Sequence, residues 1–137
     1  MVNSLFIQII IDEIDKIDWQ ENESKKRKVT NEIVNEAISN ALENRSYFEH
    51  WYSRLRIAFK GNSYKFVIGI LDKLSEVEII HKNEIFDLAV KNSIENDYKE
   101  ILNSLKYDGY INNTQNIKEY RFNSPFLKMW WYKKVAN

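Results

Sequence analysis

The last third of the chain constrains the fold most, because helix and strand patterns alternate there between clear capping residues. Residues 94–107 carry apolar side chains at helical spacing, and Gly109 follows, where the end of a helix needs a left-handed residue. Two short runs of β-forming residues with a polar turn between them come next, within 110–122. Ser124 and Pro125 then start a helix, with serine at the cap and proline at the first helical position. This order predicts a helix, a β-hairpin and a further helix.

Apolar residues also recur at helical intervals along most of the preceding sequence. Thr30, Ser63 and Ser93 each precede such a stretch, and we expect each of them to cap a helix. Residues 78–80 are expected to form a short strand. The helices expected before residue 110 are therefore 4–17, 30–42, 46–59, 64–74, 83–90 and 93–107.

The composition agrees with a mostly helical fold. Only 3 glycines and 1 proline are present, and 44% of the residues are hydrophobic, so the chain has few sharp turns and enough material for a core. The predicted order of helix, short strand, two helices, hairpin and helix is that of a winged helix-turn-helix. We therefore expect a mainly α fold with a small β-hairpin: a helical segment over 1–60, followed by a winged-helix domain over 61–137.

The charge balance and residue usage exclude several functional classes. The 20 basic and 20 acidic side chains leave no net charge, which disfavours a dedicated nucleic-acid binder. There are no cysteines, and the 2 histidines lack the spacing of a metal site, so we expect no metal. No Gly-x-Ser-x-Gly elbow and no serine with spaced His and Asp partners is present, so we expect no enzymatic activity and no cofactor in this chain. No apolar run reaches the about 20 residues that cross a bilayer, and no leader pattern is visible, which predicts a cytoplasmic protein without a membrane partner.

Three parts of the chain resemble one known group of proteins. They are Tyr47-Phe48-Glu49-His50-Trp51-Tyr52-Ser53-Arg54-Leu55, the Leu102…Leu105…Gly109-Tyr110-Ile111 step, and Tyr120-Arg121-Phe122-Asn123-Ser124-Pro125-Phe126-Leu127…Trp130-Trp131. Together they resemble the C-terminal region of archaeal-type, STAND-like AAA ATPases, in which a helical lid and a winged helix follow the nucleotide-binding core. Residues 5–14 resemble the lid helix of that family. The resemblance covers nearly the whole chain.

The resemblance implies a non-catalytic regulatory or interaction module. The chain has no Gly-x-x-x-x-Gly-Lys-Ser/Thr loop and no apolar strand ending in paired acids, so ATP and magnesium would be bound by the parent ATPase and not by this chain. The chain is then expected to be a C-terminal fragment whose partner is the parent's nucleotide-binding core, with DNA as a second partner. The alternative is an independent winged-helix regulator that binds DNA. The oligomeric state stays open.

The helix over 93–107 is the one that enters the major groove if the winged helix binds DNA. Its first turns carry Glu95, Asp97 and Glu100 but only one base, Lys99. Carboxylates at the leading end of this helix repel phosphates, so this helix favours a protein partner.

The hairpin is better suited to nucleic acid. Asn113 offers a hydrogen-bonding amide, and Lys118 and Arg121 offer charges for phosphates. With Lys99, these are the residues we expect to touch DNA if DNA is bound. The competing interpretation, which we favour, is a solvated polar hairpin.

Trp130 and Trp131 are the expected protein-interface residues. Adjacent residues of a helix point about 100° apart, so we expect at least one of these rings to be partly exposed where the parent protein would cover it.

Overall fold

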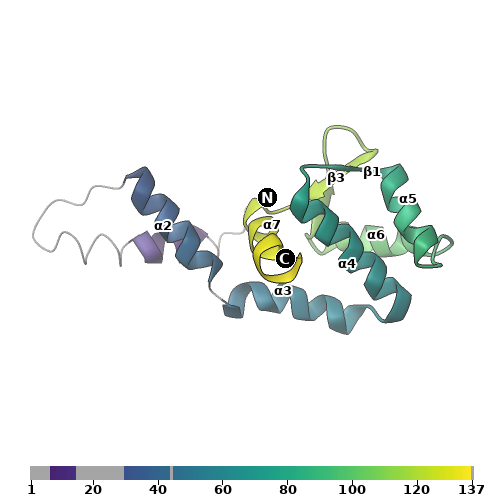
Figure 1. Cartoon of the computed structure of the whole chain (residues 1–137), viewed down its shortest axis with the longest axis horizontal. Coiled ribbons are helices and arrows are strands. Elements are labelled where there is room, and N and C mark those ends of the chain that lie inside the picture. The colour runs from purple at the N-terminus through teal and green to yellow at the C-terminus, as the bar shows by residue number, and fades with distance from the viewer. Residues whose placement is uncertain (1–6, 15–29, 44, 137) are drawn as a thin grey trace, which may run out of the picture. The chain divides into compact units, whose positions relative to one another are not determined.

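A computed structural model describes residues 7–14, 30–43 and 45–136 of the protein (Figure 1). The chain forms two compact units, residues 1–47 and 48–137. They divide within the first turn of helix α3 (Arg45–Ala58), whereas the sequence suggested a boundary near residue 60. Most of α3 therefore belongs to the C-terminal unit.

The N-terminal unit contains a helix over residues 7–14 and helix α2 (Asn31–Leu42). The Thr30 hydroxyl accepts a hydrogen bond of 3.2 Å from the Ile33 amide, which confirms Thr30 as a helix cap. The apolar residues that pack together here are Ile33 and Ala37 of α2 with Ile10 and Ile14. Their spacing of about one helical turn places each pair on one face of its helix.

Most helices and strands of the C-terminal unit are short, and the longest helix is the one that follows α3. After α3 come α4 (Gly61–Glu76), β1 (Ile80–His81), α5 (Lys82–Lys91), α6 (Tyr98–Tyr107), β2 (Ile111–Asn113), β3 (Glu119–Phe122), α7 (Pro125–Trp131) and the π-helical turn η1 (Tyr132–Ala136). The fold is thus mainly helical with a small sheet, as the sequence predicted.

The three strands form one antiparallel sheet in the order β1-β3-β2. Ile80 lies opposite Tyr120, and Ile111 lies opposite Phe122. Because β3 is the middle strand, the hairpin of residues 111–122 pairs with β1, which leads directly into α5. The hairpin also contacts α6 through β2. A hydrogen bond of 2.8 Å from the Lys82 amide to the Lys118 carbonyl strengthens the link between the hairpin and α5.

Helix α4 forms the centre of the unit and contacts α5, α6, α7 and β3. In Figure 1 it crosses the C-terminal unit beside α7. Its fully buried apolar side chains are Phe66, Val67, Ile70, Leu71 and Leu74. On the side of α3, the buried Tyr110 donates a hydrogen bond of 2.7 Å from its hydroxyl to the Trp51 carbonyl, and burial raises the pKa of Tyr110 to about 12.

Two of the predicted caps in this unit are confirmed. The Ser124 hydroxyl accepts from the Leu127 amide at 3.2 Å, and Pro125 begins α7. Gly109 has a φ of 87° after α6, and the Tyr110 amide donates to the Leu105 carbonyl. This is the pattern of a Schellman motif, in which a left-handed residue ends the helix.

Two predicted caps are wrong. Ser93 ends α5 instead of starting α6: it has a φ of 61°, and the Ile94 amide donates to the Ala89 carbonyl, which is a second Schellman motif. Helix α6 consequently begins at Tyr98. Ser63 lies inside α4, whose N-cap is Lys60 and has no side-chain cap bond.

Candidate functional site

The hairpin holds three of the residues predicted to touch nucleic acid. Lys118 and Arg121 are exposed, and Arg121 lies opposite Asn112 in the sheet. Lys99 is instead on the first turn of α6 and is also exposed. The structure therefore groups Asn113, Lys118 and Arg121 on one hairpin and places Lys99 on a neighbouring helix.

The polar side chains of the hairpin are used to build its turn. The Asn113 side-chain nitrogen donates to the Ile117 carbonyl at 2.9 Å and to the Glu119 carbonyl at 3.2 Å. The Asn116 side-chain oxygen accepts from the Lys118 amide at 2.9 Å. A side-chain amide nitrogen carries only two hydrogens, and both hydrogens of Asn113 are used in these bonds. The Asn113 side chain therefore cannot donate a hydrogen bond to the edge of a base.

The leading end of α6 is acidic, as the sequence indicated. Glu95, Asp97 and Glu100 are all exposed, and none of them forms an ion pair with another residue that the structure describes. Lys99 is the only base among them. Three uncompensated carboxylates make this end of the helix unfavourable for phosphate.

Neither Trp130 nor Trp131 has the partly exposed ring that the sequence led us to expect. They are 3% and 0% exposed, so both rings belong to the core of the C-terminal unit. Trp130 stacks on Phe48 at 5.6 Å between ring centroids, and the Trp131 ring nitrogen donates to the Asp72 carboxylate at 2.8 Å. Adjacent residues of one helix can both be buried because elements cover α7 on more than one side: α4 and β3 contact it, and Phe48 and Tyr52 of α3 meet the two indole rings.

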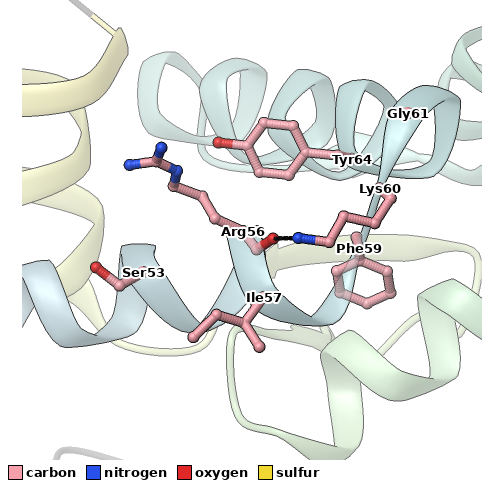
Figure 2. Close-up of a pocket in the computed structure, with 7 residues that line it drawn as sticks. All are labelled: Ser53, Arg56, Ile57, Phe59, Lys60, Gly61 and Tyr64. Carbon is pink, nitrogen blue, oxygen red and sulfur yellow. Dashed lines mark hydrogen bonds between the residues drawn. The ribbon is translucent and has the colours of Figure 1, made fainter.

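A shallow cavity of about 440 Å³ lies where α3 turns into α4 (Figure 2). Figure 2 shows Arg56 and Tyr64 reaching into the space between the two helices. The Lys60 ammonium donates to the Arg56 carbonyl at 2.8 Å, and the Tyr64 hydroxyl donates to that of Tyr52 at 3.3 Å. Burial and this hydrogen bond raise the pKa of Tyr64 to about 12. The tyrosine is therefore neutral at physiological pH, and the charged side chains that line the cavity in the described part of the chain, Arg56 and Lys60, are both basic.

A second cavity, of about 540 Å³, is a groove between α5, α6 and the start of β3. We call it the α5–α6 groove. Buried Ile85 and Leu102 contribute to its lining, together with the rings of Phe86, Tyr98 and Tyr120. Its volume lies within the range of about 300–1,000 Å³ that is usual for ligand-binding pockets.

Polar side chains complete the lining of the groove. They are Lys82, Asn83, Asp87, Lys99 and Asn103. Of these, only Lys99 was singled out by the sequence. The others were missed because the groove is assembled from three elements, and no local pattern marks residues that meet only after folding.

His81 caps helix α5. The His81 ring accepts a hydrogen bond from the Asn83 amide at 3.2 Å, and the Glu84 carboxylate accepts one from the His81 amide at 2.9 Å. This capping box starts α5, and its backbone hydrogen bond lowers the pKa of Glu84. Among the described residues, no three His, Cys, Asp or Glu side chains gather as a metal site would require.

No described helix is both long and apolar enough to span a membrane. Comparisons of the chain with protein-family models, with curated proteins and with solved structures found no match.

Proposed function

We propose that the C-terminal unit is a winged helix that docks protein, and that the chain acts as a non-catalytic regulatory region of a STAND-like AAA-type ATPase. The nucleotide-binding core of that ATPase would be its partner. The chain contains no glycine-rich phosphate loop, so ATP and magnesium would belong to the partner.

The order and pairing of the elements support the winged-helix assignment. Helix α4, strand β1, helices α5 and α6 and the β2–β3 hairpin follow one another, and β3 pairs with both other strands. In this assignment α6 is the helix that would face a nucleic acid, and the hairpin is the wing.

The single observation that favours a protein partner is the charge of this surface. Residues 82–122, which span α5, α6 and the hairpin, contain six lysines and arginines and seven aspartates and glutamates. A DNA-binding winged helix needs a basic excess here to neutralise phosphates. Protein interfaces, by contrast, commonly combine both signs of charge at a polar rim.

The second candidate is a winged-helix regulator that binds DNA through Lys118 and Arg121. Their exposure favours it. Two charges on a hairpin supply far less than the 6–10 phosphate contacts of many DNA-binding proteins, so protein docking is the better supported function.

Charge reversal at the leading end of α6, at Glu95 before the helix and at Glu100 in its first turn, tests the proposal. Duplex DNA carrying a fluorophore is titrated with the wild type and with the Glu95→Lys/Glu100→Lys variant at low and moderate salt, and anisotropy is measured. The variant should gain salt-sensitive binding, with a slope of log affinity against log salt that steepens by roughly 0.9 for each new phosphate contact.

A matched variant, Glu32→Lys/Glu36→Lys on α2, changes the net charge by the same amount at exposed positions of the N-terminal unit. It should stay close to the wild type. If both variants gained the same affinity, α6 would not be the helix that faces nucleic acid, and the winged-helix assignment would fail. Steeply salt-sensitive binding by the wild type would favour the DNA-binding regulator.

A further inference from the structure

The α5–α6 groove combines an apolar floor with lysines at its edge. Phe86 is 44% exposed although it is a large aromatic residue. Its ring meets that of Tyr98 edge to face at 5.9 Å, and Tyr98 in turn packs on the fully buried Phe66 at 6.1 Å. The exposed ring is thus held in position by the core, so a ligand that covered it would gain apolar contact with little loss of side-chain freedom.

The two lysines of the groove come from different helices. Lys82 begins α5, and Lys99 lies on the first turn of α6. Neither forms an ion pair among the described residues, whereas Lys73 pairs with Glu84 at 3.5 Å and Lys128 pairs with Glu78 at 3.6 Å. The groove therefore presents two unpaired ammonium groups beside an exposed aromatic surface.

Negative charge offsets these lysines only in part. Asp87 is the one carboxylate that lines the groove, and it also lines a neighbouring cavity together with Lys73 and Lys91. The acids at the leading end of α6 do not line the groove. Among the residues that line the groove, the two lysines outnumber the one carboxylate, and this lining is complementary to an acidic ligand.

We propose that the α5–α6 groove docks an acidic peptide segment of a partner protein that carries an aromatic anchor residue. The anchor packs against Phe86 and Tyr120, and acidic residues on either side of it meet Lys82 and Lys99. This inference rests on the proposed protein-docking function and identifies the partner's chemistry. Burial of one aromatic anchor surrounded by charge pairs is how many interfaces concentrate their affinity.

A nuclear magnetic resonance titration of the whole chain tests the inference. The probes are short synthetic peptides in which glutamates flank one phenylalanine, tyrosine or tryptophan, and the reporters include the side-chain amides of Asn83 and Asn103. At least one peptide should give saturable shifts centred on the groove, with a dissociation constant between about 10 µM and 1 mM. Peptides with alanine in place of the anchor, or with lysine in place of glutamate, should not bind.

Substitutions test the aromatic part and the charged part of the groove separately. Phe86→Ala should lower the affinity about tenfold or more, whereas Val90→Ala, which changes another exposed apolar residue of α5, should not. Lys82→Glu with Lys99→Glu should abolish binding of the acidic peptides. The control Lys65→Glu with Lys91→Glu, at exposed positions that do not line the groove, should retain it.

The inference is overturned if no peptide of the set saturates the groove, if the lysine peptides bind equally well, or if Phe86→Ala leaves the affinity unchanged. These outcomes concern the groove alone. The proposed function is tested separately, by the DNA titration of the Glu95→Lys/Glu100→Lys variant. If duplex DNA shifted the groove resonances more strongly than the peptides, the site would belong to nucleic acid instead.

Discussion

Replacement of Trp131 by phenylalanine tests whether this residue is part of the core or of an interface. Trp131 is 0% exposed and meets the rings of Tyr52 at 5.5 Å and Phe122 at 6.1 Å. Its ring nitrogen donates to the Asp72 carboxylate at 2.8 Å. Trp131→Phe keeps an aromatic ring in place but removes both the remainder of the indole and this hydrogen bond.

The expected cost has two parts. The lost ring atoms and the small cavity that they leave cost about 1–2 kcal/mol. A hydrogen bond to a charged group contributes about 1.5–3 kcal/mol, and the lower end applies because Asp72 is only partly buried. The free energy of unfolding should therefore fall by about 3 kcal/mol, a large fraction of the about 5–15 kcal/mol that stabilises a typical domain.

Urea unfolding followed by far-ultraviolet circular dichroism measures this change without relying on tryptophan fluorescence. The control is Met129→Ala, at a position of the same helix that is 44% exposed, where a change within about 0.5–1 kcal/mol is expected. If Trp131→Phe destabilised the protein no more than Met129→Ala does, Trp131 would not be a core residue. The side chain would then be better explained as part of a protein interface.

Three further predictions concern Asp72 and the helix ends. Burial raises the pKa of Asp72, so ionisation of this group opposes folding above that pKa, and Asp72→Asn should be more stable than the wild type at neutral pH. This advantage should shrink as the pH falls through the raised pKa, which urea unfolding at several pH values would detect; an advantage that grew on acidification would refute the assignment. Ser93 and Gly109 both have a positive φ, which glycine adopts more easily than other residues. Ser93→Gly should therefore stabilise the protein by about 0.5–1 kcal/mol, and Gly109→Ala should destabilise it by about 1–2 kcal/mol. Thermal unfolding that changed stability in the same direction for both variants would contradict this reasoning. Ser124→Ala should cost about 1 kcal/mol in the same measurement through loss of the α7 cap, and an unchanged midpoint would show that the cap contributes nothing.

Local rules predicted much of the secondary structure. The Ser124 and Pro125 start of α7, the Thr30 cap and the left-handed Gly109 each depend on neighbours within about one turn of helix, so the sequence alone indicates them. Ser93 was misassigned because serine is usual at helix starts, whereas here it takes a left-handed φ that ends α5.

The functional surface was less predictable, because it depends on contacts between distant residues. Nothing local to Trp130 and Trp131 reveals that several elements bury both rings. Asn113 reads as a polar contact residue in the sequence, but its amide closes the hairpin turn. Lys82 and Phe86 join Lys99 in one groove only after α5 and α6 have packed together.

An anisotropy titration of the wild type with labelled duplex DNA tests the central claim most directly. Low salt favours electrostatic binding, so the measurement is made there first and then at moderate salt. A protein-docking winged helix with acidic residues at the leading end of α6 predicts no binding at tens of micromolar protein. Binding that weakens steeply with salt, and that is lost when Lys118→Glu is combined with Arg121→Glu, would contradict the claim and make the chain a DNA-binding regulator.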